Sequence, residues 1–237
     1  MILEARKLTI GYGKTLLKEM TFDVRKGECI MLCGANGSGK TTLMRTLAGT
    51  LPALGGEIIT ERNGRNEMKP VMIPSRIPKI QGFTLEEFIK TGLYNQTPWS
   101  GKTTEETSGS IMKAMEILGI RELASRDISK LSDGEFQKGC IAIGMVRKAG
   151  LILMDEPTAF LDMENRISVL SAIGTITRET GKSVIFSSHD IYEGLKACDR
   201  VLSIGKDGIL RQSGSDKAGK ILAIKSCLKN KNIIFDN

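Results

Sequence analysis

The hydrophobic pattern divides the chain into a strand-rich start, a helical middle and an alternating end. Short apolar runs bounded by turn residues predict strands in the first part, over Leu3–Ile10, Met20–Val24 and Cys29–Leu32. The following segments predict a helix and two further strands, over Lys40–Ala48, Glu57–Thr60 and Val71–Ile73. The chain therefore begins as a small β region.

Between about residues 75 and 150 strand signals almost disappear and apolar positions recur at helical spacing. These patterns are Leu85–Leu93, the set Ile111, Met115 and Leu118, and Phe136–Val146. The polar segment Thr97–Ser110, rich in Thr, Ser, Gly and Glu, predicts an exposed loop within this region. We expect a helical insert at about 75–150.

Strands return in the last part, over Leu151–Met154, Ser183–Phe186 and Arg200–Ile204. A helix lies between the first two, with Ile167, Leu170, Ile173 and Ile176 as its apolar face. The tail after Gly214 is expected to add one more helix. Alternation of strand and helix indicates a parallel sheet. The expected fold class is α/β, a single domain over residues 1–237 with an N-terminal antiparallel β subdomain and an inserted α-helical subdomain.

Composition narrows the function classes. A hydrophobic content of 41% and a charged fraction of 26% are those of a soluble globular protein, and no apolar run approaches the roughly 20 residues of a membrane-spanning helix. With no secretory signal visible, we expect a cytoplasmic location. The formal charge of +7 favours anionic partners, but no aromatic and basic stripe indicates nucleic acid. The five cysteines include no CxxC pair, so we expect reduced, mostly buried thiols.

The segment GANGSGKTT, here called the glycine loop, matches the phosphate-binding pattern of two glycines around four spacers before Lys and a hydroxyl residue. Its residues are Gly34, Ala35, Asn36, Gly37, Ser38, Gly39, Lys40, Thr41 and Thr42. It follows a predicted strand and opens a predicted helix, so backbone N–H groups and the helix N-terminus can hold phosphates. Lys40 would reach the terminal phosphates and Thr41 would ligate magnesium. A glycine-rich turn with a solvated lysine fits this context less well. ATP is the expected ligand.

Two carboxylates follow the apolar strand of LILMDEP. Asp155 would hold Mg²⁺ through water, and Glu156 would polarise an attacking water. The alternative is a strand end that turns polar before Pro157. Because buried carboxylates are costly without a metal or water, and because the glycine loop is present, the magnesium interpretation is favoured.

The signature segment, LSDGE at Leu131–Glu135, allows two interpretations. Ser132 and Glu135 have the spacing of a helix capping box, whereas Gly134 at a helix N-terminus permits close approach of a phosphate. Two single residues are also candidates. His189, the only histidine, follows a strand, and Tyr12 lies in a glycine-flanked turn where its ring could stack on adenine or pack on the sheet.

Read in order, Tyr12, the glycine loop, LSDGE, LILMDEP, AFLD at 159–162 and His189 resemble the nucleotide-binding subunit of ABC transporters, with its P-loop NTPase core. The resemblance covers the whole chain. It implies two subunits paired head to tail, so that ATP on Lys40 and Thr41 of one is closed over by the signature residues Ser132, Asp133, Gly134 and Glu135 of the other. It also implies Glu156 as general base, His189 as the residue contacting the γ-phosphate, and Asp162 as the link between the two sites.

This sequence departs from the family pattern at two places. Ser75 stands in VMIPSRIP where the family usually has the glutamine that contacts magnesium at the hinge facing the membrane subunit, and its hydroxyl could serve the metal instead. The signature reads LSDGE in place of LSGGQ. An acid at Glu135 would repel a triphosphate unless it turns away or caps the helix.

The segments LSDGE, DEPTAFLD and IPSRIP leading into FTLEEFIKTGL are similar to ATPases of iron-siderophore, haem and cobalamin importers. That resemblance implies an ATPase on the cytoplasmic face of the membrane, with a second copy, integral membrane permease subunits and a solute-binding protein as partners, and with no nucleic acid. Another importer, an exporter, or a soluble ABC ATPase such as an iron-sulphur assembly factor remain alternatives.

Overall fold

A six-stranded sheet forms the centre of the computed structural model, which describes residues 1–63, 66–67, 69–93 and 105–227. Its strand order is β11-β10-β3-β9-β8-β7, and all neighbours pair in parallel except the edge strand β11. The strands are β3 (Cys29–Gly34), β7 (Val71–Ile73), β8 (Leu151–Met154), β9 (Ser183–Ser187), β10 (Arg200–Ile204) and β11 (Leu210–Gln212). The parallel sheet predicted from the alternating pattern is confirmed.

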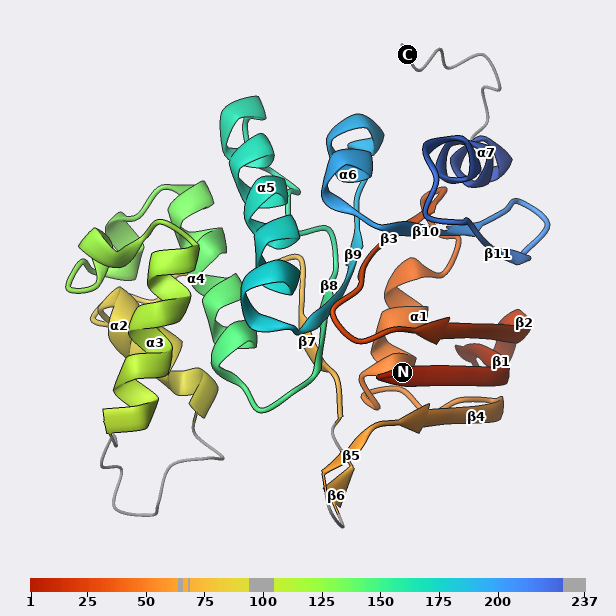
Figure 1. Ribbon diagram of the computed structural model, residues 1–237, viewed down its shortest axis with the longest axis horizontal. Helices are drawn as coiled ribbons and strands as arrows, with labels where there is room; N and C mark the ends of the chain where they lie inside the picture. Colours follow the sequence, from red (N-terminus) through yellow and green to blue (C-terminus); the bar gives the residue numbers. More distant parts are fainter. Residues whose placement is uncertain (64–65, 68, 94–104, 228–237) are drawn as a thin grey trace.

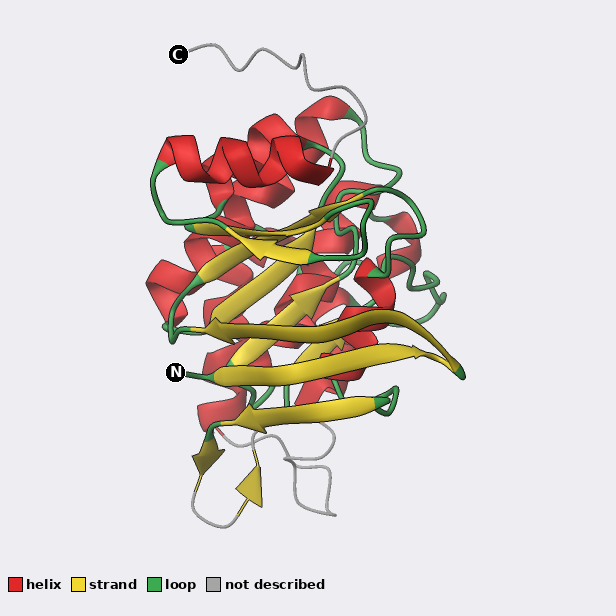
Figure 2. Cartoon of the chain, turned by 90° about the vertical axis from the view of Figure 1, so that its right-hand side faces the viewer, coloured by secondary structure: helices red, strands yellow, loops and turns green. Residues whose placement is uncertain are grey.

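A three-stranded antiparallel sheet of order β2-β1-β4 stacks on the central one and lies nearest the viewer in Figure 2. Its strands are β1 (Leu3–Tyr12), β2 (Lys14–Val24) and β4 (Gly55–Thr60), and a small ribbon of β5 (Arg62–Asn63) and β6 (Asn66–Glu67) follows. The predicted N-terminal antiparallel β region is therefore confirmed.

Seven helices surround the sheets within the described ranges: α1 (Lys40–Leu47), α2 (Leu85–Lys90), α3 (Glu105–Ile117), α4 (Asp133–Val146), α5 (Met163–Thr180), α6 (Ile191–Ala197) and α7 (Lys217–Cys227). Short 3-10 helices cover Thr91–Leu93, Arg121–Leu123 and Ile128–Lys130. Helices α2, α3 and α4 form one group beside the sheets, on the left of Figure 1. In the parts of the chain that are described, no helix has the length and apolar character needed to cross a membrane.

Side chains of the central strands alternate between two hydrophobic cores, as the period of two in a strand requires. In β3, Met31 and Cys33 face the helices, whereas Ile30 and Leu32 face the antiparallel sheet and α1. Each buried aliphatic side chain contributes about 1.5–3 kcal/mol, so burial on both faces stabilises this strand at the centre of the fold. All five cysteines are free and buried, in agreement with the predicted reduced thiols.

Several boundaries differ from the sequence predictions. Strand β2 begins at Lys14, six residues before the predicted start at Met20, because the mixed residues there pair with β1 at a sheet edge. The loop predicted over Thr97–Ser110 is wrong from Glu105 onward, where α3 begins with Glu105 and Glu106 favouring its N-terminus. Residues 97–104 lie outside the described part.

Further differences concern elements too short or too edge-like for periodicity to detect. Helix α6 and strand β11 were not predicted, and Ile167, expected on the buried face of α5, is exposed. The helix predicted after Gly214 is confirmed as α7. The predicted helices at Leu85 and Phe136 are confirmed as α2 and α4, the first ending in a 3-10 turn.

The parallel pairing brings the polar strand ends together. Strands β3, β9, β8 and β7 are consecutive neighbours, so the segments after their carboxyl ends emerge at the same edge of the sheet. These segments carry the glycine loop, His189, the Asp155–Glu156 pair and Ser75, respectively.

Candidate functional site

The glycine loop connects β3 to α1 in a tight arch. A Cβ on Gly34 would lie 2.6 Å from Ser38 Oγ, so the loop closes on itself only because that position is glycine. Gly39 has a φ of +105° and lies against Leu16, where a Cβ would be 2.9 Å from Leu16 Cδ2. Both glycines are therefore required by the backbone path of the loop.

Lys40 and Ser38 give the loop its capacity for an anion. Lys40 is only 6% exposed, and its Nζ donates to the carbonyls of Gly34 and Ala35 at 3.0 and 3.3 Å. Ser38 Oγ is buried with no hydrogen-bond partner among the described residues. The first turn of α1 has no acidic residue. A buried cation, an unsatisfied hydroxyl and a helix N-terminus together suit a phosphate group.

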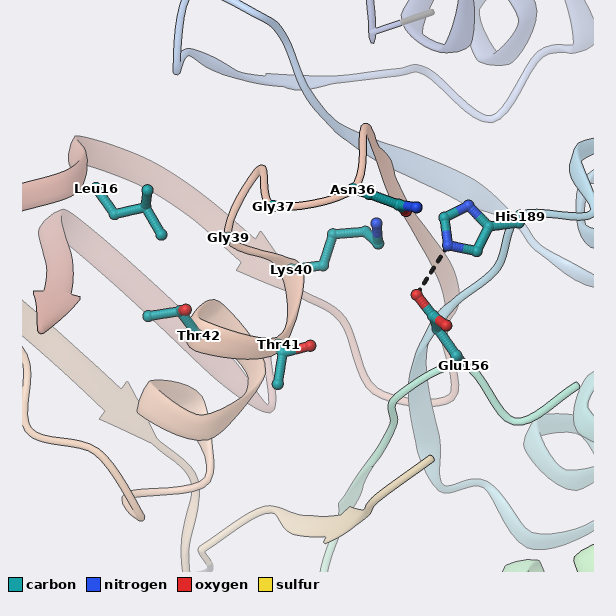
Figure 3. A pocket seen from close by; sticks show the side chains of 9 residues that line it. All are labelled: Leu16, Asn36, Gly37, Gly39, Lys40, Thr41, Thr42, Glu156 and His189. Atoms are coloured by element: carbon teal, nitrogen blue, oxygen red, sulfur yellow. Dashed lines mark hydrogen bonds and ion pairs between the residues drawn. The ribbon is translucent and has the colours of Figure 1, made fainter. Parts of the chain in front are cut away.

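A cavity of about 540 Å³ opens over the loop (Figure 3). It is lined by Leu16, Asn36, Gly37, Gly39, Lys40, Thr41, Thr42, Glu156 and His189. The structure thus brings six of the nine predicted loop residues together with the predicted base and histidine, although these segments are far apart in sequence. Gly34, Ala35 and Ser38 belong to the loop but do not line the cavity. Leu16, from β2, is a lining residue that sequence reasoning missed, since an apolar residue in an edge strand gave no chemical signal.

Asp155 is held from two sides at the end of β8. Thr41 Oγ1 donates to Asp155 Oδ2 at 2.7 Å, and Ser187 Oγ donates to Asp155 Oδ1 at 3.0 Å. Asp155 is buried, and a buried carboxylate needs such donors. Thr41 and Asp155 present oxygen atoms beside the phosphate loop, which is the donor chemistry that Mg²⁺ prefers when it shares its shell with phosphates and waters. The residues therefore fit a magnesium ion.

Glu156 occupies a left-handed backbone conformation, with a φ of +48°. Its backbone N–H donates to Ser187 Oγ at 2.7 Å, and its Oε1 lies 2.8 Å from His189 Nε2 (Figure 3). A non-glycine residue in this region costs about 1–3 kcal/mol and persists where surrounding contacts hold it. The carboxylate is therefore directed into the cavity by contacts from both its main chain and its side chain.

The signature segment begins α4 with a complete capping box. Ser132 Oγ accepts from the Glu135 N–H at 3.2 Å, and Glu135 Oε2 accepts from the Ser132 N–H at 2.7 Å. The hydrogen bond from the Ser132 backbone lowers the pKa of Glu135. Of the two outcomes foreseen for this acid, the structure shows the cap. The carboxylate that replaces glutamine in the signature is directed back to its own helix.

The other signature residues contact neighbouring elements of the same chain. Asp133 Oδ1 accepts from Lys79 Nζ at 2.7 Å, and Lys79 also donates to the Leu131 carbonyl at 2.7 Å. Gly134 is buried against Asn165 of α5, where a Cβ would lie 2.6 Å from Asn165 Cγ. The signature is thereby attached both to the segment after Ser75 and to α5.

Asp162 caps α5 and holds the same asparagine. Its Oδ1 accepts from the Asn165 N–H at 2.8 Å and its Oδ2 from Asn165 Nδ2 at 2.9 Å. Both bonds lower the pKa of Asp162. Asn165, which sequence reasoning also missed, therefore connects Asp162 to Gly134. The cavity over the glycine loop is lined neither by Asp162 nor by any of the four signature residues.

Tyr12 and Ser75 do not line the cavity. Tyr12 is 59% exposed at the end of β1, and its hydroxyl accepts a hydrogen bond from Arg45 at 3.3 Å. Ser75 is half-buried two residues after β7, beside the strand that leads into Asp155. Its adjacency to Asp155 follows from the backbone bond between the Asp155 N–H and the Ile73 carbonyl, 3.0 Å long.

Comparison with known proteins identifies the fold and the family. A family model described as ABC transporter matches residues 17–159, more than half of the chain. The petrobactin import ATP-binding protein FpuD of Bacillus anthracis is 29% identical over 89% of this chain and 80% of its own length. The ferric enterobactin transport ATP-binding protein FepC of Escherichia coli is 28% identical over the same shares. A solved metal-chelate type ABC transporter superposes with a TM-score of 0.82 at 22% identity, covering 95% of this chain and 88% of its own, which supports the fold.

The site and the comparisons agree. The glycine loop, Glu156 and the histidine meet at one cavity, and Asp155 is hydrogen-bonded to Thr41 of the loop. The matching family model covers the loop, the signature segment and both carboxylates. The chain belongs to the ABC transporter family, as an ATP-binding, ATP-hydrolysing subunit.

Proposed function

We propose that this subunit supplies the energy for import of a ferric siderophore. The observation that carries the solute class is the nature of its relatives: FpuD is named for petrobactin import and FepC for ferric enterobactin transport. Both similarities extend over most of this chain and most of each relative. They agree with the resemblance of LSDGE and DEPTAFLD to siderophore, haem and cobalamin importers.

In the proposed site, the glycine loop holds the triphosphate of ATP. Lys40 would exchange its two bonds to loop carbonyls for bonds to the phosphates, and Ser38 Oγ would gain the partner it lacks. Thr41, Asp155 and Ser75 would hold Mg²⁺, which would supply charge neutralisation at the β- and γ-phosphates. Tyr12 and Leu16 lie on the β-strand side of the loop, where an adenine base would pack against them.

Glu156 is the proposed general base. Its carboxylate lines the cavity beside the loop and is hydrogen-bonded to His189, so it can orient and deprotonate a water directed at the terminal phosphate. General base catalysis of this kind contributes about 10²–10⁴-fold in rate. His189 would exchange its contact with Glu156 for the γ-phosphate, since His189 and Glu156 line the same cavity as Lys40, which would hold the terminal phosphates.

We propose that a second copy completes each site, with Ser132, Asp133, Gly134 and Glu135 of one subunit closing over ATP on the other. What supports this is the arrangement within one chain: the signature is at the N-terminus of α4, and its residues do not line the glycine-loop cavity. The Ser132 and Asp133 side chains are exposed. Asp162, attached to Gly134 through Asn165, would connect the two sites.

We further propose permease subunits and a solute-binding protein as partners, with residues 1–237 acting as one ATPase domain on the cytoplasmic face of the cell membrane. The helical region at about 75–150 would be the inserted subdomain that meets the permease. This assignment is supported by the position of α2, α3 and α4 as a group beside the sheets.

The test is ATP hydrolysis by the reconstituted complex of this chain with its permease in vesicles. A ferric siderophore with its binding protein should stimulate hydrolysis and enter the vesicles, and Glu156→Gln should abolish both. Stimulation by an unrelated solute, with none by ferric siderophores, would overturn the solute class while leaving the ATPase assignment intact.

A further inference from the structure

Ser187, at the end of β9, joins both carboxylate residues of the site through one hydroxyl. Its Oγ accepts the Glu156 backbone N–H at 2.7 Å and donates to Asp155 Oδ1 at 3.0 Å. Thr41 of the glycine loop donates to the other oxygen of the same carboxylate. A continuous chain of hydrogen bonds therefore runs from the main chain of Glu156 through Ser187 and Asp155 to the loop.

The geometry explains why this hydroxyl matters to Glu156. The strained φ of +48° at Glu156 persists only when neighbouring contacts favour it over ordinary conformations. His189 contacts the tip of the side chain, whereas Ser187 holds the main chain. Because a hydroxyl can accept and donate at once, serine serves both Glu156 and Asp155, and an apolar residue would leave the partly buried Glu156 N–H without this partner.

We propose that Ser187 is a positioning residue for ATP hydrolysis: it fixes the backbone of the general base Glu156 and the orientation of the Asp155 carboxylate. Ser187 does not line the cavity. It therefore acts on the reaction through Glu156 and Asp155. The proposal rests on the role of Glu156 as general base.

A merely structural role for a buried serine is the competing explanation, and the same strand provides a matched control. Ser183, at the opposite end of β9, is equally buried. Its Oγ likewise accepts a backbone N–H, from Gly27 at 3.0 Å, and donates to an oxygen, the Arg25 carbonyl at 2.8 Å. Ser183 lies away from the site, so its removal perturbs stability without the positioning effect.

The experiment compares Ser187→Ala, Ser187→Cys and Ser187→Thr with Ser183→Ala in the full chain. Cysteine has the shape of serine with a slightly larger sulfur atom that hydrogen-bonds only weakly, and threonine keeps the hydroxyl while adding a methyl group. The measurements are kcat and KM for ATP, equilibrium nucleotide affinity, thermal midpoint, and hydrogen exchange of the Glu156 amide without nucleotide. The exchange measurement is independent of activity and of magnesium.

We expect Ser187→Ala and Ser187→Cys to lower kcat roughly 10- to 100-fold, which is the effect of losing a charge-assisted hydrogen bond. Nucleotide affinity should stay within about threefold of that of the original chain, because the loop and Lys40 are unchanged. The Glu156 amide should exchange faster in both. Ser187→Thr should have the kcat and the Glu156 amide protection of the original chain. Ser183→Ala should also have the original kcat, even if its thermal midpoint is lower. If Ser187→Ala does not fold, the comparison of Ser187→Cys with Ser187→Thr tests the positioning role in its place.

The contrary result is a cysteine variant as active as the original and a threonine variant that is not, which would assign Ser187 to packing alone. Unchanged exchange of the Glu156 amide would also overturn the proposal. Glu156→Gln separates this failure from that of the underlying assignment: if Glu156→Gln hydrolyses ATP at the original rate, the base itself is wrong.

Discussion

Replacing Gly134 by alanine tests whether the signature helix is packed on α5 through Asn165. A Cβ at Gly134 would lie 2.6 Å from Asn165 Cγ and 2.9 Å from its Cβ, closer than packed atoms approach. Such overpacking costs about 1–3 kcal/mol. Alanine in a helix in turn gains up to about 1 kcal/mol over glycine. The net expected loss for Gly134→Ala is therefore about 1 kcal/mol in the free energy of unfolding.

Second-site changes sharpen the test. Asn165→Ala removes the amide but leaves its Cβ at 2.9 Å, so the clash should be relieved in part. Asn165→Gly removes that atom too, and in this background Gly134→Ala should become neutral or stabilising. Gly109→Ala is the matched control, because Gly109 lies in α3 where an added Cβ would meet no described atom of another element within 4 Å, and it should stabilise by about 0.5–1 kcal/mol.

Urea unfolding measures these free energies, and the Gly134–Asn165 pair forms a double-mutant cycle. The coupling should increase from Asn165→Ala to Asn165→Gly. If Gly134→Ala stabilises the chain as much as Gly109→Ala does, the packing of α4 on α5 through Asn165 is refuted. ATPase activity, measured alongside, reports separately on the proposed approach of Gly134 to nucleotide on a second copy.

Two further predictions concern charged groups. Glu135→Ala should lower the free energy of unfolding at neutral pH by about 0.5–1 kcal/mol because the capping box is lost, whereas Glu135→Gln should keep it. The pKa of Glu135 in the folded chain lies below its ordinary value of 4.5. The original chain should therefore lose the stability contributed by the Glu135 cap as pH falls below about 4.5. A Glu135→Gln variant with the same acid dependence of unfolding would contradict the cap. Burial lowers the pKa of Lys182 to about 8 from 10.5, so between these values the unfolded chain binds more protons and the free energy of unfolding should rise with pH. Urea titrations of Lys182→Met should lack that rise, and an equal rise in the variant would exclude Lys182 as its source.

The strands and the loop were predictable because their signals are local. The two-sided apolar runs at Cys29 and Leu151 identify buried parallel strands, and the glycine loop needs glycine at Gly34 and Gly39 for its own backbone path. Parallel pairing then follows from alternation, and it places the ends of β3, β8 and β9 at one edge without further information.

What the sequence could not predict depends on contacts between distant segments. Ser187 looked like one of two equivalent serines in FSSHD, and only the pairing of β8 with β9 directs its hydroxyl to Asp155 and Glu156. Asn165 acquires a role only through the packing of α5 on α4. The fate of Glu135 was left open between repulsion and capping, and the backbone geometry of the helix N-terminus decides it.

The most direct test of the account is the mass of Glu156→Gln in solution with and without ATP, measured by light scattering. Without nucleotide the 25.9 kDa chain should be monomeric, and with ATP and Mg²⁺ it should double in mass and retain unhydrolysed ATP. Lys40→Ala should stay monomeric under both conditions. A Glu156→Gln variant that binds ATP but stays monomeric, or that hydrolyses it at the original rate, would contradict a two-copy site with Glu156 as its base.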